Sequence, residues 1–193
     1  GMGSIRISIL CFLLPAFLTG CSLFQAANSP VIAEFTEDFE VSGRIAVKIN
    51  GEGSSARIKW SHRGDVDAVD VYTPVGSIIA VILVSPRTGA MLETKDETHT
   101  ATSVEELTHR VLGWSLPLSG LKFWARGRVD PSVFVGRVAP LDDQNRMTYF
   151  EQDGWKITFL RYSGESDVPR VIKLEHGDLK IRFIVDEWKV LGQ

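Results

Sequence analysis

The amino-acid sequence predicts a mainly β protein of the α+β class, built on a single, strongly curved, open antiparallel sheet (a half-barrel) with short helices covering its concave, apolar side. Two observations lead to this prediction. Apolar and polar residues alternate along many short runs separated by turn-forming residues, and this pattern is interrupted only once, by two short segments with helical spacing. The chain has 193 residues, of which 44% are hydrophobic, so one domain with a terminal extension can bury a sizeable core.

The first two strands have the clearest pattern. Apolar residues recur at every second position over the run from Val41 to Ile49, and a second alternating run extends from Ala56 to Trp60. The segment Gly51-Glu52-Gly53 between the two runs has the composition of a turn. We therefore expect a hairpin with one face toward the core and one face toward water.

Further strands are expected along the rest of the chain. Turn signals lie at Ser85-Pro86, Asp153-Gly154 and His176-Gly177-Asp178. The runs expected to form strands are 67–73, 77–84, 89–95, 133–139, 145–151, 154–162, 170–175 and 179–188.

Two short helices are expected where the alternation stops. Ser103-Val104-Glu105-Glu106 is a capping box, in which the serine and the second glutamate can satisfy backbone groups of the first helical turn. Leu107 and Val111 follow it at helical spacing. A second helix is predicted from Leu118 to Arg126, and it brings Leu118 and Trp124 near each other.

Residues 1–20 have the pattern of a bacterial lipoprotein signal peptide. One positive charge, Arg6, precedes the apolar run Ile7–Leu18, which is too short to span a bilayer comfortably. The run ends in Leu18-Thr19-Gly20-Cys21, which matches the lipobox: small residues before the cysteine fit the signal peptidase, and the thiol is alkylated by a diacylglycerol. We expect a covalent lipid on Cys21. A plain secretory signal with a chance cysteine is the alternative.

The chain is therefore predicted to have three parts: the signal peptide 1–20, a lipidated N-terminus and tether 21–38, and the half-barrel domain 39–193. Loss of Cys11 with the signal leaves a single cysteine and hence no internal disulfide. Ser22 follows Cys21; in enterobacteria an aspartate at this position tends to retain a lipoprotein in the inner membrane. Serine therefore favours the outer membrane of a Gram-negative bacterium, with the chain anchored on the periplasmic face.

Neither charge nor motifs indicate a nucleic-acid-binding protein, an enzyme or a metal protein. The formal net charge is −3, with no long run of one sign. The stretch Gly51–Ala56 fits G-x-G-x-x-A but lies between two strands rather than before a helix, and Ser119–Lys122 matches S-x-x-K without its companion motifs. The four histidines are widely separated and lack metal-ligand spacing. We expect no catalytic residue, no metal and no cofactor beyond the lipid on Cys21.

An apolar residue stands at the tip of one predicted turn. The segment Thr73-Pro74-Val75-Gly76-Ser77 has the proline and glycine of a turn, but it carries a valine where polar residues are usual. The local pattern does not say what this side chain contacts.

Several segments, in the same order along the chain, resemble the LolB family of outer-membrane lipoproteins. The resemblance covers nearly the whole mature chain and includes the lipobox. The segments that carry it are Ser42–Lys48, Ala56–Trp60, Pro74–Gly76, Leu112-Gly113, Leu116–Leu118, Leu121-x-x-Trp124-x-x-Gly127, Asp153–Ile157, Pro169–Leu174, Leu179–Asp186 and Trp188.

The resemblance implies the same half-barrel fold and a transfer activity without covalent catalysis. LolB proteins receive other lipoproteins from the periplasmic carrier LolA and place them in the outer membrane, with no ATP used at this step. By this resemblance the domain 39–193 binds triacylated lipoproteins in an apolar cavity. A LolA-like carrier, client lipoproteins with their acyl chains, and the membrane surface are then its partners. Because transfer needs only one copy of the chain, we expect a monomer.

The resemblance also implies a membrane-insertion loop at Pro74, Val75 and Gly76. The residue between the proline and the glycine is normally leucine in this family. Valine is shorter and buries less area, so membrane engagement through this loop could be weaker. The alternative is that Val75 folds back onto the protein.

The acyl-chain cavity is predicted by combining the inward phase of the strands with the family-like helix. The predicted lining residues are Ile45, Val47, Trp60, Leu118, Trp124, Trp155, Ile157, Phe183 and Val185. An error of one residue in the phase of a strand would exchange its two faces. The five tryptophans of the chain could instead fill one core.

Two other functions stay open at this point. The chain could be a lipid-binding lipoprotein that shuttles another amphiphile, such as a phospholipid or glycolipid, or a scaffold lipoprotein whose sheet is filled by its own side chains. A membrane-facing turn favours insertion over simple shuttling, and a cavity would exclude the scaffold.

Overall fold

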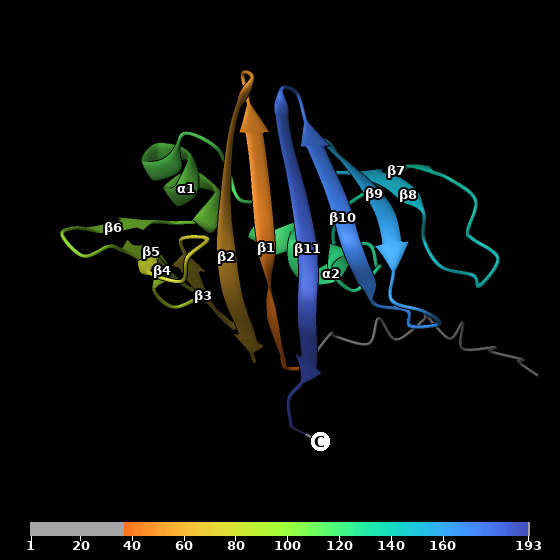
Figure 1. The fold of residues 1–193 in the computed structure, drawn as a ribbon, viewed down its shortest axis with the longest axis horizontal. Coiled ribbons are helices and arrows are strands. Elements are labelled where there is room, and N and C mark those ends of the chain that lie inside the picture. Colours follow the sequence, from red (N-terminus) through yellow and green to blue (C-terminus); the bar gives the residue numbers. More distant parts are fainter. Residues whose placement is uncertain (1–36, 193) are drawn as a thin grey trace, which may run out of the picture. The chain divides into compact units, whose positions relative to one another are not determined.

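Eleven antiparallel strands form one sheet in the computed structural model, which describes residues 37–192 (Figure 1). Neighbours in the sheet are neighbours in the sequence except at the centre, where the first strand pairs with the last. The two edge strands do not pair with each other, so the sheet is open, as predicted. Across the sheet the strands are β6 (Thr98–Ala101), β5 (Gly89–Glu93), β4 (Ile78–Ser85), β3 (Val66–Tyr72), β2 (Glu52–Arg63), β1 (Phe39–Ile49), β11 (Leu179–Val190), β10 (Pro169–His176), β9 (Trp155–Tyr162), β8 (Tyr149–Gln152) and β7 (Val135–Val138).

The β1–β2 hairpin turns at Asn50 and Gly51, slightly earlier than the predicted Gly51–Gly53 turn. Ile49 pairs with Glu52 across the turn, and the φ angles of Asn50 and Gly51 are 50° and 83°. Two central residues with positive φ are typical of a type I′ turn, and Asn-Gly is its preferred sequence. As a result β2 begins at Glu52 and is longer than the alternating run that predicted it.

Two short helices lie between β6 and β7 in the sequence, as expected: α1 (Val104–Leu112) and α2 (Leu118–Trp124). The Ser103 hydroxyl accepts a hydrogen bond of 3.2 Å from the N–H of Glu106, as the capping box predicts. Gly113, with a φ of 81°, ends α1 in the left-handed conformation. In Figure 1, α2 lies behind the central strands. Neither helix of the described part has the length and apolar character that crossing a bilayer requires.

The core lies on one face of the sheet, which we call the inner face. In β1, Ile45 and Val47 are buried, whereas Arg44, Ala46 and Lys48 between and beside them are exposed. The same alternation continues in the other long strands, and the buried apolar residues of both helices belong to the same hydrophobic cluster. The other side of these strands is the outer face of the sheet.

Gly43 lets the first and last strands approach each other at the centre of the sheet. The register between β1 and β11 shifts between Ser42 and Gly43, which marks a β-bulge. A Cβ atom on Gly43 would overlap the backbone carbonyl of Ile184 in β11. Bulges bend the strand and increase its twist, so this position helps to curve the sheet.

A buried polar group joins β2 to β3. The carboxylate oxygen Oδ1 of Asp67 accepts a hydrogen bond of 2.9 Å from the indole N–H of Trp60, and the Nδ1 atom of His62 lies 2.8 Å from the same oxygen. All three residues are at least nine-tenths buried. A charged acceptor makes stronger hydrogen bonds than a neutral one, so this carboxylate anchors both rings in the core.

We expect Asp67→Asn to lower the free energy of unfolding by about 1–2 kcal/mol, because the amide keeps the shape but loses the charge of the acceptor. Urea denaturation followed by tryptophan fluorescence measures this loss. Asp70→Asn, on the same strand but only half-buried, is the matched control and should change stability by less than about 0.5 kcal/mol. Equal losses in the two variants would show that the buried group does not stabilise the fold.

The sequence prediction differs from the structure mainly near the edges of the sheet. The edge strand β6 was not predicted, and β7 and β8 are shorter than the predicted runs 133–139 and 145–151. The segment between β7 and β8 instead forms a turn in which the Asp142 carboxylate accepts hydrogen bonds from the backbone N–H groups of Gln144 and Arg146. The helix α2 ends at Trp124, two residues before the predicted end.

The predictions for the N-terminus concern residues outside the described part of the chain. These are the signal peptide 1–20, the lipid anchor Cys21 and nearly all of the tether 21–38. They stay predictions here.

Candidate functional site

An apolar cavity of about 300 Å³ lies on the inner face of the sheet, between strands β1 to β4 and the two helices. No charged side chain lines it, and its only hydroxyl groups belong to Ser54 and Ser55. Its lining residues are Ile45, Val47, Ser54, Ser55, Ala56, Ile58, Trp60, Val69, Val71, Ile79, Ile82, Leu112, Trp114, Leu116, Leu118 and Leu121.

The cavity is partly open to solvent. Ile79 and Leu112 both line it and are 48% and 46% exposed, whereas Trp60 and Ile82 on its inner wall are almost completely buried. An apolar cavity with an open mouth and no charge holds hydrocarbon more readily than water or a polar ligand. A scaffold filled by its own side chains would have no such space, so the cavity counts against that alternative.

The structure brings four of the nine predicted cavity residues together in this lining. Ile45 and Val47 come from β1, Trp60 from β2 and Leu118 from the start of α2. Their inward orientation follows from the strand phase assumed in the prediction.

The other five predicted residues are buried in the same hydrophobic cluster but do not line this cavity. They are Trp124, Trp155, Ile157, Phe183 and Val185. Trp124 donates a hydrogen bond of 2.9 Å from its indole N–H to the side-chain oxygen of Gln152, and its ring lies 6.4 Å from that of Trp155. These contacts are those of core residues on the β8–β11 side of the sheet.

Sequence reasoning missed twelve of the sixteen residues that line the cavity. Four of them lie on β2, and the others lie on β3 and β4 and around the helices: Ser54, Ser55, Ala56, Ile58, Val69, Val71, Ile79, Ile82, Leu112, Trp114, Leu116 and Leu121. Two signals could have found some of them. The inward phase of β3 marks Val69 and Val71, and the spacing of Leu118 and Leu121 places both on one side of α2.

The turn between β3 and β4 presents Val75 to solvent. The N–H of Gly76 donates to the carbonyl of Thr73 at 2.9 Å, and the N–H of Thr73 donates to the carbonyl of Ser77 at 2.8 Å. Proline at the second position and glycine at the fourth suit a type I turn. The side chain of Val75 is 90% exposed. The alternative in which Val75 packs back onto the protein is therefore not what the structure shows.

The exposed turn and the cavity are connected through the first residues of β4. Ile78 is 57% exposed and, with Val75, extends the apolar surface of the turn. The next residue, Ile79, lines the mouth of the cavity. Exposed apolar residues thus extend from the tip of the turn to the mouth of the cavity. Exposed apolar surface of this kind is typical of interaction sites.

The sequence motifs with possible chemistry have ordinary structural roles. Gly51 lies in the β1–β2 turn. The Glu105 carboxylate accepts hydrogen bonds from the hydroxyl and the backbone N–H of Ser119. Over residues 37–192 no group of three or more histidine, cysteine, aspartate or glutamate side chains is placed to hold a metal ion.

Comparison with known proteins identifies one family. The family model described as outer membrane lipoprotein LolB matches residues 37–188 of this chain. An outer-membrane lipoprotein LolB from Nitrosomonas europaea is 35% identical over 158 residues, which cover 79% of this chain and 73% of that protein. The LolB of an Azoarcus species is 32% identical over 189 residues and covers 96% of both chains.

A comparison with solved structures supports the fold. The crystal structure of a LolA superfamily protein from Nitrosomonas europaea matches with a TM-score of 0.50, covering 82% of this chain and 88% of that one. Because the sequences are only 8% identical, this match supports the fold alone.

Proposed function

Because the chain belongs to the LolB family of outer membrane lipoproteins, we propose that it accepts triacylated lipoproteins from a LolA-like periplasmic carrier and inserts them into the outer membrane. The proposal has three parts: uptake of acyl chains in the inner cavity, release through the Val75 turn, and anchoring of the protein by its own lipid. Each part rests on a different feature of the chain.

Uptake is assigned to the apolar cavity on the inner face. An acyl chain gains about 0.8 kcal/mol for each buried CH₂, so crossing the periplasm requires an apolar container. We place α1 and α2 over the concave side of the sheet as the cover of this container, since Leu118 and Leu121 share its lining with Ile45 and Trp60. At about 300 Å³ the cavity is at the small end of ligand sites, so the helices move outward to admit several chains.

Release is assigned to the turn that carries Val75. The single observation that carries the proposal is that exposed apolar residues lead from this turn to the cavity mouth at Ile79. When Val75 and Ile78 enter the bilayer, the mouth comes close to the hydrocarbon layer, and the acyl chains can exchange one apolar environment for another. A protein that only shuttles amphiphiles through water has no use for such a probe.

No covalent chemistry or nucleotide is required in this scheme. Transfer from carrier to receptor needs only a cavity that binds the acyl chains more tightly than the carrier does. We therefore propose a non-enzymatic protein with no cofactor other than the lipid on Cys21, acting as a monomer on the periplasmic face of the outer membrane.

The transfer experiment uses the mature chain with Cys21→Ser, so that no lipid is attached, and a LolA-like carrier loaded with a triacylated lipoprotein. Affinity isolation on separate tags, without nucleotide, shows which protein holds the client. We expect the client to move to this chain and not back. Recovery of phospholipid from the purified protein, with no movement of the client, would overturn the proposal in favour of a general lipid shuttle.

We expect Cys21→Ser in the full chain to remove the protein from the outer-membrane fraction, because stable anchoring depends on covalently attached acyl chains. Membrane fractionation and flotation in a density gradient measure this change. Cys11→Ser is the matched control, since this residue lies inside the predicted signal, and it should leave the protein in the membrane. Retention of the Cys21→Ser protein in the outer-membrane fraction would contradict the predicted anchor.

A further inference from the structure

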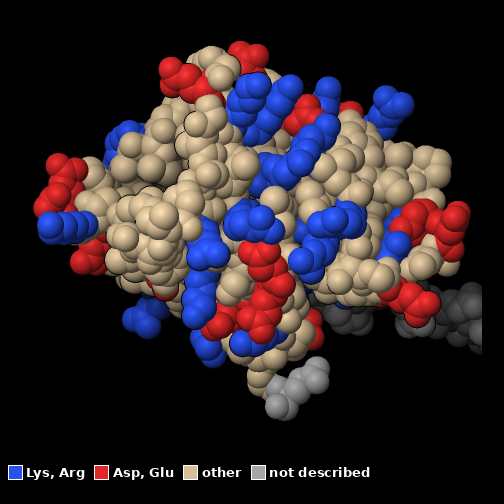
Figure 2. Space-filling view, in the orientation of Figure 1, with Lys and Arg blue, Asp and Glu red and all other residues tan. Residues whose placement is uncertain are grey.

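The outer face of the sheet carries a group of cations over its central strands. We define the outer basic face as Lys48 of β1, Arg57 of β2, Lys173 of β10, and Lys180 and Arg182 of β11. All of them except the half-buried Lys173 are exposed. Figure 2 shows Lys and Arg side chains gathered over the middle of this face, with Asp and Glu side chains among them in its lower part and uncharged surface beside them over β3 and β4. The mild net charge of the chain hides this local concentration.

Several of these cations lie directly opposite one another in neighbouring strands. Lys48 pairs with Lys180 between β1 and β11, and Lys173 pairs with Arg182 between β10 and β11. Arg57 also lies opposite Arg44 between β2 and β1, but Arg44 is paired with the Asp186 carboxylate through two hydrogen bonds of 2.9 and 3.2 Å. Like charges directly opposite on one face of a sheet destabilise it. The opposed cations therefore lower the stability of the sheet, which indicates that an anionic partner binds them.

Few acidic side chains within the described part of the chain neutralise these cations. Lys173 contacts Glu175 at 2.6 Å, and the hydrogen bond that it donates, with the charges of Lys180 and Lys156, lowers the pKa of Glu175. No carboxylate of residues 37–192 lies within 4.0 Å of Lys48, Arg57, Lys180 or Arg182. Most of the positive charge on the outer basic face is thus free to interact with a partner.

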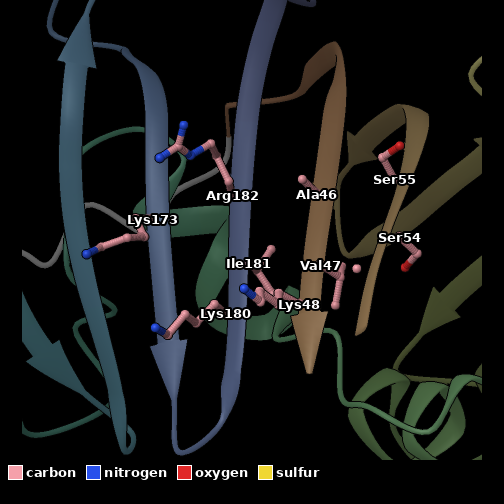
Figure 3. Close-up of a pocket in the computed structure, with 10 residues that line it drawn as sticks. Ala46, Val47, Lys48, Ser54, Ser55, Lys173, Lys180, Ile181 and Arg182 are labelled. Atoms are coloured by element: carbon pink, nitrogen blue, oxygen red, sulfur yellow. The ribbon is translucent and has the colours of Figure 1, made fainter. Parts of the chain in front are cut away.

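The surface between these cations is hollowed. A depression of about 560 Å³ is floored by small side chains, including Ala46 and Ser55, and is bordered by four of the cations. Figure 3 shows Lys48, Lys173, Lys180 and Arg182 arranged over three neighbouring strands around it. Small residues at its floor leave room for phosphate oxygens to approach several cationic groups together.

The outer basic face extends to the Val75 turn. A second depression on the outer face is lined by Arg57, Lys59 and one carboxylate, Asp186, together with Gly76, the residue after Val75. Cations of the outer face therefore border the turn whose tip is apolar. A bilayer surface matches both features. Its phosphate groups can pair with the cations, and the hydrocarbon directly below them can receive the apolar tip of the turn.

We propose that the outer basic face binds the phosphate groups of anionic phospholipids, so that the protein docks on the bilayer through the outer face of its sheet while the Val75 turn enters the hydrocarbon. An acidic soluble protein could pair with the cations but would leave the apolar turn in water. The inference deepens the proposed function, on which it rests for the role of the turn, and adds the lipid class and the orientation of docking.

The test measures binding of the mature Cys21→Ser chain to two kinds of vesicle: phosphatidylcholine alone, and phosphatidylcholine with phosphatidylglycerol at roughly three to one. We expect tighter binding to the anionic vesicles, weakening as salt is added. In the triple variant Lys48→Gln, Lys180→Gln, Arg182→Gln, binding to anionic vesicles should fall about fivefold for each cation, or about one-hundred-fold in total. Its melting temperature should stay equal or rise, because two like-charge pairs are relieved.

A charge-matched control removes three cations away from this face: Arg87→Gln, Lys95→Gln and Lys122→Gln, at two turns and on α2. This variant should bind anionic vesicles like the unmodified chain. Equal losses in the two triple variants, or equal binding of the unmodified chain to both vesicles, would overturn the proposal. Loss of carrier binding with intact vesicle binding in the first variant would also overturn it and assign the face to an acidic protein.

Client uptake from the carrier, measured without vesicles, separates this inference from the proposed function. The variant of the outer basic face should take up clients normally, since the inner cavity is unchanged. If the unmodified chain does not take up clients, the proposed function is rejected. The vesicle-binding result still tests the outer basic face independently.

Discussion

Replacing Val75 with glutamate is expected to abolish delivery of clients into membranes while leaving folding and client uptake unchanged. The side chain is 90% exposed, so the fold loses no contact when it is replaced. In the membrane the valine gains about 1.5–3 kcal/mol by burial, whereas a charged side chain costs about 2.5–3.5 kcal/mol. The difference corresponds to a loss of delivery of more than about one-hundred-fold. Transfer of a labelled client from the loaded protein to liposomes, followed by flotation, measures it.

Two further variants control this experiment. Val66→Glu introduces the same charge at another exposed valine, 41% accessible at the start of β3, and should deliver clients normally. Val75→Leu restores the residue implied by the family resemblance and adds one methylene, worth about 0.8 kcal/mol or about a fourfold gain. A Val75→Glu protein that unfolds, or that delivers as well as Val66→Glu, would refute the assignment of the turn.

Replacing Ala56 with tryptophan is expected to block client uptake. Ala56 lies on β2 opposite Ile45 and lines the inner cavity, whose volume is about 300 Å³. An indole at this position occupies space that the acyl chains would fill. Displacing only two methylenes costs about 1.6 kcal/mol, which lowers affinity about fifteenfold. Isolation of the receptor after incubation with the loaded carrier measures the client retained.

The matched control is Ala46→Trp, which makes the same change on β1 at an exposed position of the outer face. It should take up clients as the unmodified chain does. Melting temperatures of the two proteins show whether the larger side chain disturbs the fold. If both variants capture clients equally well, the inner cavity is not the binding site.

Most of the architecture could be predicted from local patterns. Period-two alternation identified the long strands, because one face of each is buried and the other is wet. The capping box located the start of α1, and Asn50-Gly51 marks the first hairpin although the prediction placed the turn slightly late. The edge strand β6 was missed because Thr98–Ala101 is short and has no apolar alternation. The segment is a strand because it pairs with β5, and its local sequence does not indicate this pairing.

The site was predicted less completely because it depends on which strands and helices meet. The sequence does not indicate that β1 pairs with β11, since these strands lie at opposite ends of the domain. Inward phase identified buried residues such as Phe183 and Ile157, but it could not separate the filled part of the core from the open part beside β3 and β4. The outer basic face could not be predicted from the sequence either, because Lys48 and Lys180 become neighbours only in the sheet.

Photo-crosslinking tests most directly whether the inner cavity holds the acyl chains of a client. A photo-reactive side chain replaces Ala56 in one protein and Ala46 in another, and each receives a triacylated lipoprotein from the carrier before illumination. We predict that position 56, on the inner face, forms a crosslink to the acyl chains and that position 46, on the outer face, does not. A crosslink at position 46 alone, or none at either position in a protein that retains the client, would contradict binding in this cavity.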